Sequence, residues 1–268
     1  MDFASNPTSS AYLLVVHGSR DPRPQQAIET LVRQVADLLG TGAADLVGWA
    51  ALELQPQPLH QQICQFLHPI AAQIDRLHVI PLFLLPGVHV CEDIPAEVEL
   101  ARREIGNRVS DSHREYRPHI CIHPHLGSNP DIAESLTETL HAREETAWVL
   151  LAHGSRYPGG NRPIAEIAVR LQQQARKSVL PAYWSVPPSL ETQVRALVES
   201  GYDRIGILPY FLFAGGITDA IAQTVDRLAS QFPHTQLSLA EPLGVSDRLV
   251  RQIVSRIESH SISLSNQS

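Results

Sequence analysis

The chain has 268 residues, of which 43% are hydrophobic and 18% are charged. This composition supports a folded core and excludes a disordered chain. The net charge is -7 and no basic stripe is present, so nucleic-acid binding is not expected. The longest apolar stretch, near residues 77–91, is interrupted by proline and glycine and is too short to span a bilayer. Because the opening MDFASNPTSS contains no targeting pattern, we expect a cytoplasmic protein with no membrane partner.

Several common kinds of chemistry are also excluded by the residues present. Cys64, Cys91 and Cys121 are far apart and form no CxxC pair, so neither a disulfide framework nor a thiolate zinc site is expected. The sequence contains no GxSxG elbow, no phosphate-binding P-loop and no GxGxxG turn. It does contain 13 histidines, which leaves metal chemistry open.

The chain is an internal repeat. Three segments of the first half recur in the same order in the second half. The pairs are YLLVVHGSR (12–20) with WVLLAHGSR (148–156), DRLHVIPLFLLPG (75–87) with DRIGILPYFLFAG (203–215), and HLG (125–127) with PLG (242–244). We therefore predict a tandem duplication, with an N-terminal lobe of residues 1–143 and a C-terminal lobe of residues 144–268.

Short apolar runs rich in Val, Ile and Leu predict four buried strands in each half. They cover residues 12–16, 45–50, 77–83 and 119–123, and then 147–152, 179–184, 204–211 and 235–240. Helical patterns alternate with them. This order predicts an α/β fold of two similar doubly wound lobes, each a four-stranded parallel sheet flanked by helices.

The helices are predicted from apolar spacing and from their first residues. One face combines Ala27, Ile28, Leu31, Val35 and Leu38, and a second combines Leu59, Ile63, Phe66, Ile70 and Ile74. Asp93 is expected to cap a helix that reaches Ile105, and Ser246 is expected to cap the last helix. Asp131 belongs to the first turn of a helix that reaches Leu140.

Three polar residues of the first half follow strands directly. These are His17 after YLLVV, Glu53 in ALELQ, and His89 after a Pro-Gly turn. In open parallel sheets, ligands bind beyond the carboxyl ends of the strands. Two imidazoles and one carboxylate suit a divalent ion such as iron or cobalt. We predict that His17 and His89 bind a metal and that Glu53 assists.

The second half retains only part of this set. His153 repeats His17, whereas Glu53 aligns with about position 184, Trp184, and His89 with about position 217, Ile217. We therefore predict that the C-terminal lobe has lost its site. A histidine at a strand end can instead be a hydrogen-bonded turn residue, and Glu53 can be a surface carboxylate that pairs with an arginine.

Two other polar segments have more than one interpretation. His119, Cys121, His123 and His125 alternate along one stretch and would lie on the same face of a strand. They form either a second metal site or a strand with a polar end. Asp21 and its neighbours at the next helix start either form a solvated helix start or contact an anionic ligand.

The motifs HGSR, LEL around Glu53 and PLFLLPGVHVCEDIP resemble those of the CbiX/SirB family of class II chelatases, over nearly the whole chain. The resemblance implies ATP-independent insertion of a divalent metal into sirohydrochlorin, for siroheme or cobalamin synthesis. His17 and His89 would be the two metal-handling histidines and Glu53 the glutamate of the second strand. Imidazole and carboxylate ligands suit iron, cobalt and nickel alike, and we expect Fe2+ with only a slight preference over Co2+. No prosthetic group is expected, because no Cys-rich tail for an iron–sulfur centre is present.

The implied substrate carries eight carboxylates around a flat ring, so local positive groups are needed. We assign Arg20, Arg23, Ser19 and Gly87 to substrate binding, and Arg156 and Arg162 are further candidates. Because both lobes belong to one chain, a monomer is expected. The competing hypotheses are a non-catalytic tetrapyrrole or metal carrier on the same scaffold, and an unrelated two-lobe binding protein with chance HG turns.

Overall fold

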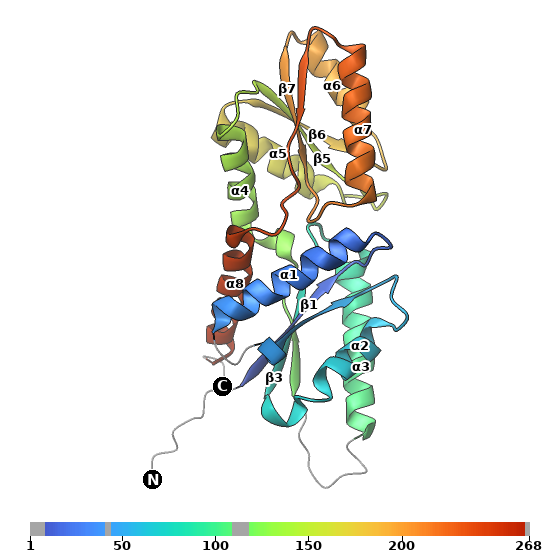
Figure 1. The fold of residues 1–268 in the computed structure, drawn as a ribbon, viewed down its shortest axis with the longest axis vertical. Coiled ribbons are helices and arrows are strands. Elements are labelled where there is room, and N and C mark those ends of the chain that lie inside the picture. The colour runs from blue at the N-terminus through green and yellow to red at the C-terminus, as the bar shows by residue number, and fades with distance from the viewer. Residues whose placement is uncertain (1–8, 41–43, 109–117, 266–268) are drawn as a thin grey trace. The chain divides into compact units, whose positions relative to one another are not determined.

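The computed structural model describes residues 9–40, 44–108 and 118–265 (Figure 1). The strands are β1 Ser10–Val16, β2 Val47–Ala51, β3 Arg76–Pro81, β4 His119–Ile122, β5 Ala147–Ala152, β6 Ser178–Tyr183, β7 Arg204–Pro209 and β8 Gln236–Leu239. The α-helices are α1 Pro22–Leu39, α2 Leu59–Leu67, α3 Ile94–Arg108, α4 Pro130–His141, α5 Arg162–Ala175, α6 Leu190–Glu199, α7 Gly216–Gln231 and α8 Asp247–Ser265. Residues 1–8, where the sequence predicts no targeting segment, lie outside the described ranges.

The strands form two four-stranded parallel sheets with the same topology. Their orders are β2-β1-β3-β4 and β6-β5-β7-β8. The central strands β1 and β5 are apolar on both faces, and Leu13, Leu14 and Val15 are fully buried in β1. A strand of this kind requires cover on both sides, which the helices provide. The predicted fold class is therefore confirmed, and the eight predicted strands are all present.

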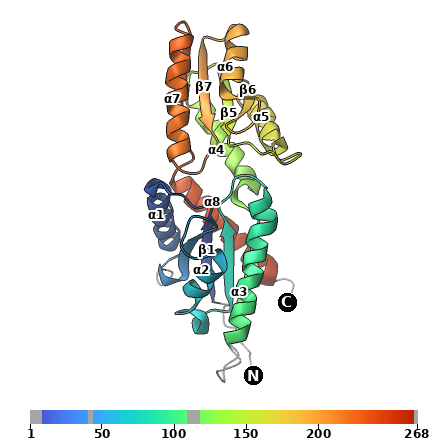
Figure 2. The same cartoon turned by 90° about the vertical axis from the view of Figure 1, so that its right-hand side faces the viewer.

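Helices cover both faces of the first sheet. Residues such as Leu13 and Val79 form one core cluster with Ile63 of α2 and Val98 of α3. Figure 2 shows α1 on the opposite side of the sheet from α3, and α8 packs beside α1 (Figure 1). No helix in the described ranges combines the length and apolar composition needed to cross a lipid bilayer.

The compact units do not follow the sequence repeats. One unit contains residues 1–126 together with 245–268, and the other contains residues 127–244. Helix α4 therefore packs on α5 of the second repeat, where Thr137 donates a hydrogen bond to Gln174 and the Lys177 ammonium donates to carbonyls at the end of α4. The expected lobes 1–143 and 144–268 describe the duplication, whereas tertiary packing gives each unit the last helix of the other repeat.

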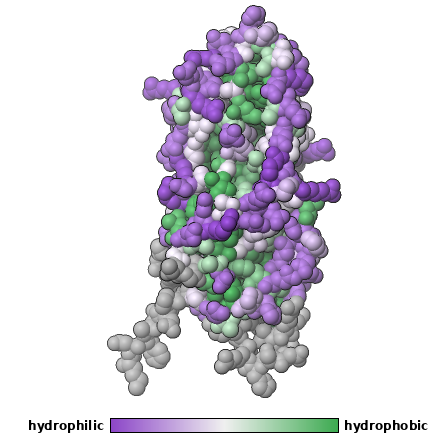
Figure 3. Space-filling model, viewed as in Figure 1, coloured by the Kyte–Doolittle hydropathy of each residue, from purple (hydrophilic) through white to green (hydrophobic). Residues whose placement is uncertain are grey.

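Three helix predictions need correction. Helix α2 ends at Leu67, because Pro69 has no N–H to continue the helix, although Ile70 and Ile74 are still buried in the core. Leu38, in the last turn of α1, is 50% exposed and does not join the buried face. Hydrophobic residues also reach the surface in Figure 3, where they gather in groups along the middle of this face between hydrophilic residues at its edges. Asp93 lies inside a helical turn that begins at His89 and is therefore not a cap.

The other two helix predictions are confirmed. Asp131 lies in the first turn of α4, and the Ser246 hydroxyl accepts a hydrogen bond from the Leu249 N–H at the start of α8. Such side-chain acceptors satisfy amide groups that a helix start leaves without internal partners.

Candidate metal centre

Three neighbouring strands deliver the predicted side chains to one edge of the first sheet. His17 follows β1, Glu53 lies two residues beyond β2, and His89 begins the helical turn after β3. The Glu53 N–H donates to the His17 carbonyl at 2.9 Å, which extends the β1–β2 ladder by one step past the strand ends. The parallel order therefore brings together residues that are 72 positions apart in sequence.

The three side chains converge. His17 Nε2 lies 3.9 Å from Glu53 Oε2, and the rings of His17 and His89 are 5.0 Å apart at an interplanar angle of 80°. One ligand atom from each residue lies within 4.8 Å of the other two, and in the described part of the chain no other group of histidine, cysteine and carboxylate residues does this.

The spacing suits one shared ion. Metal bonds to nitrogen and oxygen are about 2.0–2.2 Å long for zinc, so two ligand atoms on one ion lie about 3–4 Å apart. The separation of 3.9 Å between His17 and Glu53 is of that size and is too long for a hydrogen bond. The side chains are 51% and 49% exposed, so a bound ion would remain accessible to a second reactant.

The histidine rings are oriented by further contacts. His89 Nδ1 lies 2.7 Å from Asp93 Oδ2, and His17 Nδ1 lies 3.3 Å from the Gly18 carbonyl oxygen. The Phe83 ring is 6.3 Å from that of His17 and 6.2 Å from that of His89. These contacts leave the Nε2 atoms as the nitrogens available to a ligand.

Gly18 has a conformation and surroundings that only glycine fits. Its φ is +104°, and a Cβ atom placed there would lie 2.0 Å from the Glu53 carbonyl oxygen. Because that neighbour is backbone, a small shift of a flexible side chain cannot relieve the contact. The backbone segments that carry His17 and Glu53 can therefore approach this closely only because residue 18 is glycine.

The residues assigned to anion binding have different surroundings. Arg23 donates through Nε and Nη2 to the Asp21 carboxylate, with a shortest distance of 2.6 Å, and Asp21 also caps α1. Ser19 Oγ accepts from the Asp21 N–H. The solvated helix start is thus the better interpretation of this segment. Arg20 is exposed and remains a candidate contact for an anion.

The remaining candidates for substrate binding are Gly87, Arg162 and Arg156. Gly87 is exposed, its carbonyl accepts hydrogen bonds from the Val90 and Cys91 N–H groups, and no atom lies within 4 Å of a Cβ built there. In the second repeat, Arg162 Nε donates to Glu166 at 2.6 Å, and Arg156 is exposed.

The second repeat has no equivalent of Glu53. The Ser185 N–H donates to the His153 carbonyl, as that of Glu53 does to His17, so the structural counterpart of Glu53 is Ser185. The sequence alignment places Glu53 near Trp184, and the backbone ladder assigns its counterpart to the adjacent Ser185. Ser185 Oγ donates to the His153 carbonyl, and Ile217 occupies the place of His89. A serine hydroxyl and an alkyl side chain do not replace a carboxylate and an imidazole.

The histidines of residues 119–125 do not converge on one point. His119 Nδ1 lies 3.0 Å from Cys121 Sγ near the surface, whereas His123 is buried with its Nε2 2.8 Å from Nδ1 of His78. His78 is fully buried on β3, and its ring stacks on Tyr12 at 5.2 Å. His78 was not predicted as a site residue, although a histidine inside an apolar strand was an available signal.

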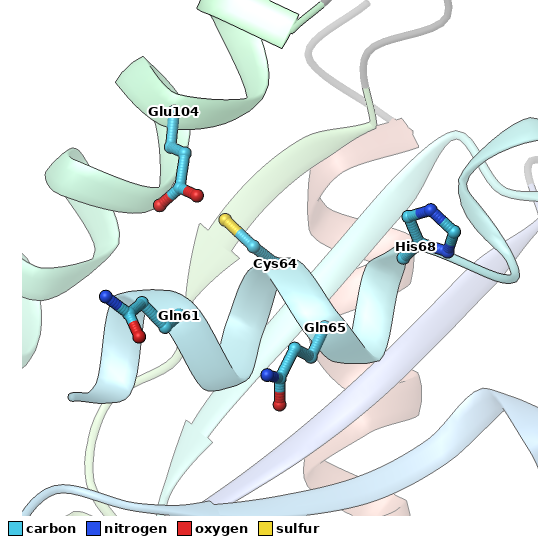
Figure 4. A pocket seen from close by; sticks show the side chains of 5 residues that line it. All are labelled: Gln61, Cys64, Gln65, His68 and Glu104. Atoms are coloured by element: carbon cyan, nitrogen blue, oxygen red, sulfur yellow. The ribbon is translucent and has the colours of Figure 1, made fainter. Parts of the chain in front are cut away.

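A separate pocket of about 480 Å³ lies between α2 and α3 of the first unit. Figure 4 shows Cys64 and Gln61 of α2 on one side and Glu104 of α3 on the other, with Gln65 and His68 completing the lining. It shares no residue with the histidine and glutamate group, and the described residues of its lining form no metal-ligand group.

The fold and the site together define a class: a duplicated α/β protein with an exposed two-histidine, one-glutamate group at the sheet edge of one repeat. The sequence model of the CbiX family matches residues 11–143 and again residues 147–260. The chain belongs to the CbiX family.

Two curated relatives match over nearly all of the chain. A protein of Priestia megaterium named sirohydrochlorin ferrochelatase is 25% identical over 264 residues, which cover 96% of this chain and 92% of the relative. A sirohydrochlorin cobaltochelatase of the same organism is 26% identical over 262 residues, or 92% of this chain and 78% of the relative. The solved structure of SirB from Bacillus subtilis with Fe3+ matches with a TM-score of 0.74 and 22% identity, over 97% of this chain and 98% of that one.

Proposed function

We propose that this protein is a sirohydrochlorin chelatase, which inserts Fe2+ or Co2+ into sirohydrochlorin without ATP. The observation that carries the proposal is the convergence of His17, Glu53 and His89 at the carboxyl ends of three parallel strands. Family membership and the names of both relatives agree with it.

Each residue of the group has a role that its chemistry allows. His17 and His89 hold the incoming ion through neutral imidazole nitrogens, which bind divalent iron and cobalt without adding charge. A site with few protein ligands keeps coordination positions open, and the exposure of both rings leaves the ion accessible to the macrocycle. Holding ring and metal in register lowers the entropic cost of the encounter.

The reaction also requires removal of protons. Insertion breaks two pyrrole N–H bonds, forms metal–nitrogen bonds in their place and releases two protons for each divalent ion. Glu53, half exposed and adjacent to the metal ligands, accepts one proton, and the second passes to water. A positioned carboxylate is a suitable general base for this step.

Recognition of the anionic ring requires local positive charge, because the protein has a net charge of -7. Arg20, exposed two residues before the α1 start and three residues after His17, is the best candidate for a contact with a substrate carboxylate. Arg23 is a weaker candidate because its guanidinium already binds Asp21. All three members of the candidate metal group come from one chain, so we propose that a monomer is active.

The test is incubation of the purified protein with sirohydrochlorin and either Fe2+ or Co2+, monitored by the absorbance change of the tetrapyrrole. We expect metallated product in large molar excess over protein, with iron somewhat faster than cobalt. Faster insertion of cobalt would assign the protein to cobalamin synthesis instead of siroheme synthesis. Tight binding with no more than one product per protein would support the carrier hypothesis and contradict the proposed function.

Glu53→Gln is expected to slow insertion by about 100-fold, the lower end of the effect of a positioned general base. The amide keeps the size and hydrogen-bonding capacity of the side chain but cannot accept a pyrrole proton, so the Kd for sirohydrochlorin should change far less than kcat. Single-turnover rates and fluorescence titration separate the two quantities. Glu29→Gln, an exposed carboxylate on α1, is the control. An unchanged rate for Glu53→Gln would remove Glu53 from the mechanism.

A further inference from the structure

The turn that carries His89 is a π-helical turn. Residues His89–Asp93 form it directly before α3, and the Ile94 N–H donates to the His89 carbonyl five residues earlier. Such turns contain one residue more than a regular α-helical turn and occur frequently at functional sites.

The second repeat shows that one residue has been added here. From β3 in the first repeat and β7 in the second up to this turn, the two repeats correspond with a constant offset: Leu82 and Tyr210 make the same backbone bond, and the Gly87 and Gly215 carbonyls accept from the fourth residue after each. Beyond the turn, the offset is one residue smaller. The fully buried Ile94 and Val98 of the first repeat then correspond to the buried Ile221 and Val225 of the second.

The extra residue changes where Asp93 points. In a regular α-helix continued from Gly87, residue 93 would occupy the buried position that Ile221 holds in the second repeat. The π-turn gives that position to Ile94, which is fully buried, and turns Asp93 outward. Asp93 Oδ2 then lies 2.7 Å from His89 Nδ1.

The contact fixes which nitrogen of His89 faces the site. A carboxylate only accepts hydrogen bonds, so Nδ1 carries the hydrogen and Nε2 is left with its lone pair for a metal. The pair is too exposed to be explained by stability, because its side chains are 36% and 44% accessible and exposed ion pairs contribute little. Carboxylates that orient metal-binding histidines in this way raise metal affinity.

We propose that Asp93 is a positioning residue, which the π-turn directs toward His89 so that His89 Nε2 is presented to the substrate metal. The inference rests on the proposed function for the identity of the metal and deepens it with a residue outside the His17, Glu53 and His89 group. This role also explains why the two repeats differ by one residue at this turn. In the described residues, the π-turn occurs in the repeat that has the complete His17, Glu53 and His89 group.

The first test measures binding of Co2+ alone, without tetrapyrrole, by visible absorption. Asp93→Ala is expected to weaken Co2+ binding about 10- to 100-fold, the usual effect of losing such an orienting contact. Asp93→Asn, whose amide oxygen still accepts a hydrogen bond, should fall between Asp93→Ala and the wild type. Glu92→Ala removes the same charge from the adjacent exposed position and should bind Co2+ as the wild type does.

The second measurement determines the tautomer of the His89 ring. Nitrogen-15 NMR of the imidazoles, assigned with a His89→Ala variant, should show His89 with its hydrogen on Nδ1 in the wild type and a mixture of tautomers in Asp93→Ala. Circular dichroism on heating should show the same fold and melting for all variants, because the pair is exposed.

The outcomes separate this inference from the proposed function. Wild-type Co2+ affinity and an unchanged His89 tautomer in Asp93→Ala would overturn the positioning role and leave the chelatase proposal intact. Equal losses in Glu92→Ala and Asp93→Ala would also overturn it, because they would indicate a general charge effect. Co2+ binding that depends on Asp93, in a protein that never inserts the metal into sirohydrochlorin, would support the positioning role and contradict the chelatase function.

Discussion

His17→Ala and His89→Ala are each expected to lower the rate of metal insertion by more than about 100-fold, since loss of a direct ligand should exceed the effect of losing a residue that only orients one. Each substitution removes one of the two imidazoles that we propose hold the ion, whose rings lie 5.0 Å apart, so a single histidine is left to bind it. The fold should survive, because both side chains are at least one-third exposed and surface substitutions usually change stability by less than about 0.5 kcal/mol.

The second repeat supplies the matched control for this experiment. His153 follows β5 as His17 follows β1, but Ser185 and Ile217 stand where the other two members of the group would be. His153→Ala should therefore keep nearly the full rate of insertion, measured by tetrapyrrole absorbance at equal protein concentration. An inactive His153→Ala beside an active His17→Ala would show that the reaction takes place in the other repeat.

Gly18→Ala is expected to abolish activity although it changes neither a ligand nor a charge. Two costs combine at this position: a left-handed φ of +104°, which costs alanine about 1–3 kcal/mol, and a Cβ that would lie 2.0 Å from the Glu53 carbonyl oxygen. Relief of the clash requires the segments of His17 and Glu53 to separate, which would break the 2.9 Å hydrogen bond between their backbones. Insertion assays and thermal melting would measure both consequences.

Gly40→Ala separates these two costs. Gly40 has nearly the same φ, +106°, at the end of α1, but no atom lies within 4 Å of a Cβ built there. We expect the strain to lower the melting temperature while activity is retained. Comparable activity in Gly18→Ala and Gly40→Ala would show that the approach of Gly18 to Glu53 does not matter for the site.

The sheets could be predicted from sequence because their strands are chemically simple. A run such as Ala147–Ala152 is buried at every position, and only a strand covered on both faces accommodates such a run with short flanking turns. The repeated HGSR segments then supported the strand that precedes each of them, β1 and β5. Helix ends were less predictable, as α2 shows, because an apolar spacing continued through Ile70 and Ile74 although the helix ends at Leu67.

The candidate metal group was only partly predictable from the sequence. His17 and His89 follow clear strand patterns, but the position of Asp93 depends on a one-residue helical insertion that apolar spacing does not reveal. The counterpart of Glu53 could be placed only approximately for a similar reason, since only the backbone ladder identifies Ser185. His78 and His123 were separated by 45 residues, and only pairing of β3 with β4 places their rings together.

The sequence by itself determined the duplication, the parallel sheets and the edge at which polar residues gather, because buried apolar runs and their order leave few alternatives. Only the tertiary structure decided that three ligand atoms lie within 4.8 Å of one another, that Asp93 faces His89, and that each compact unit contains the last helix of the other repeat. These features depend on contacts between residues far apart in the chain, and local patterns carry no information about such distances.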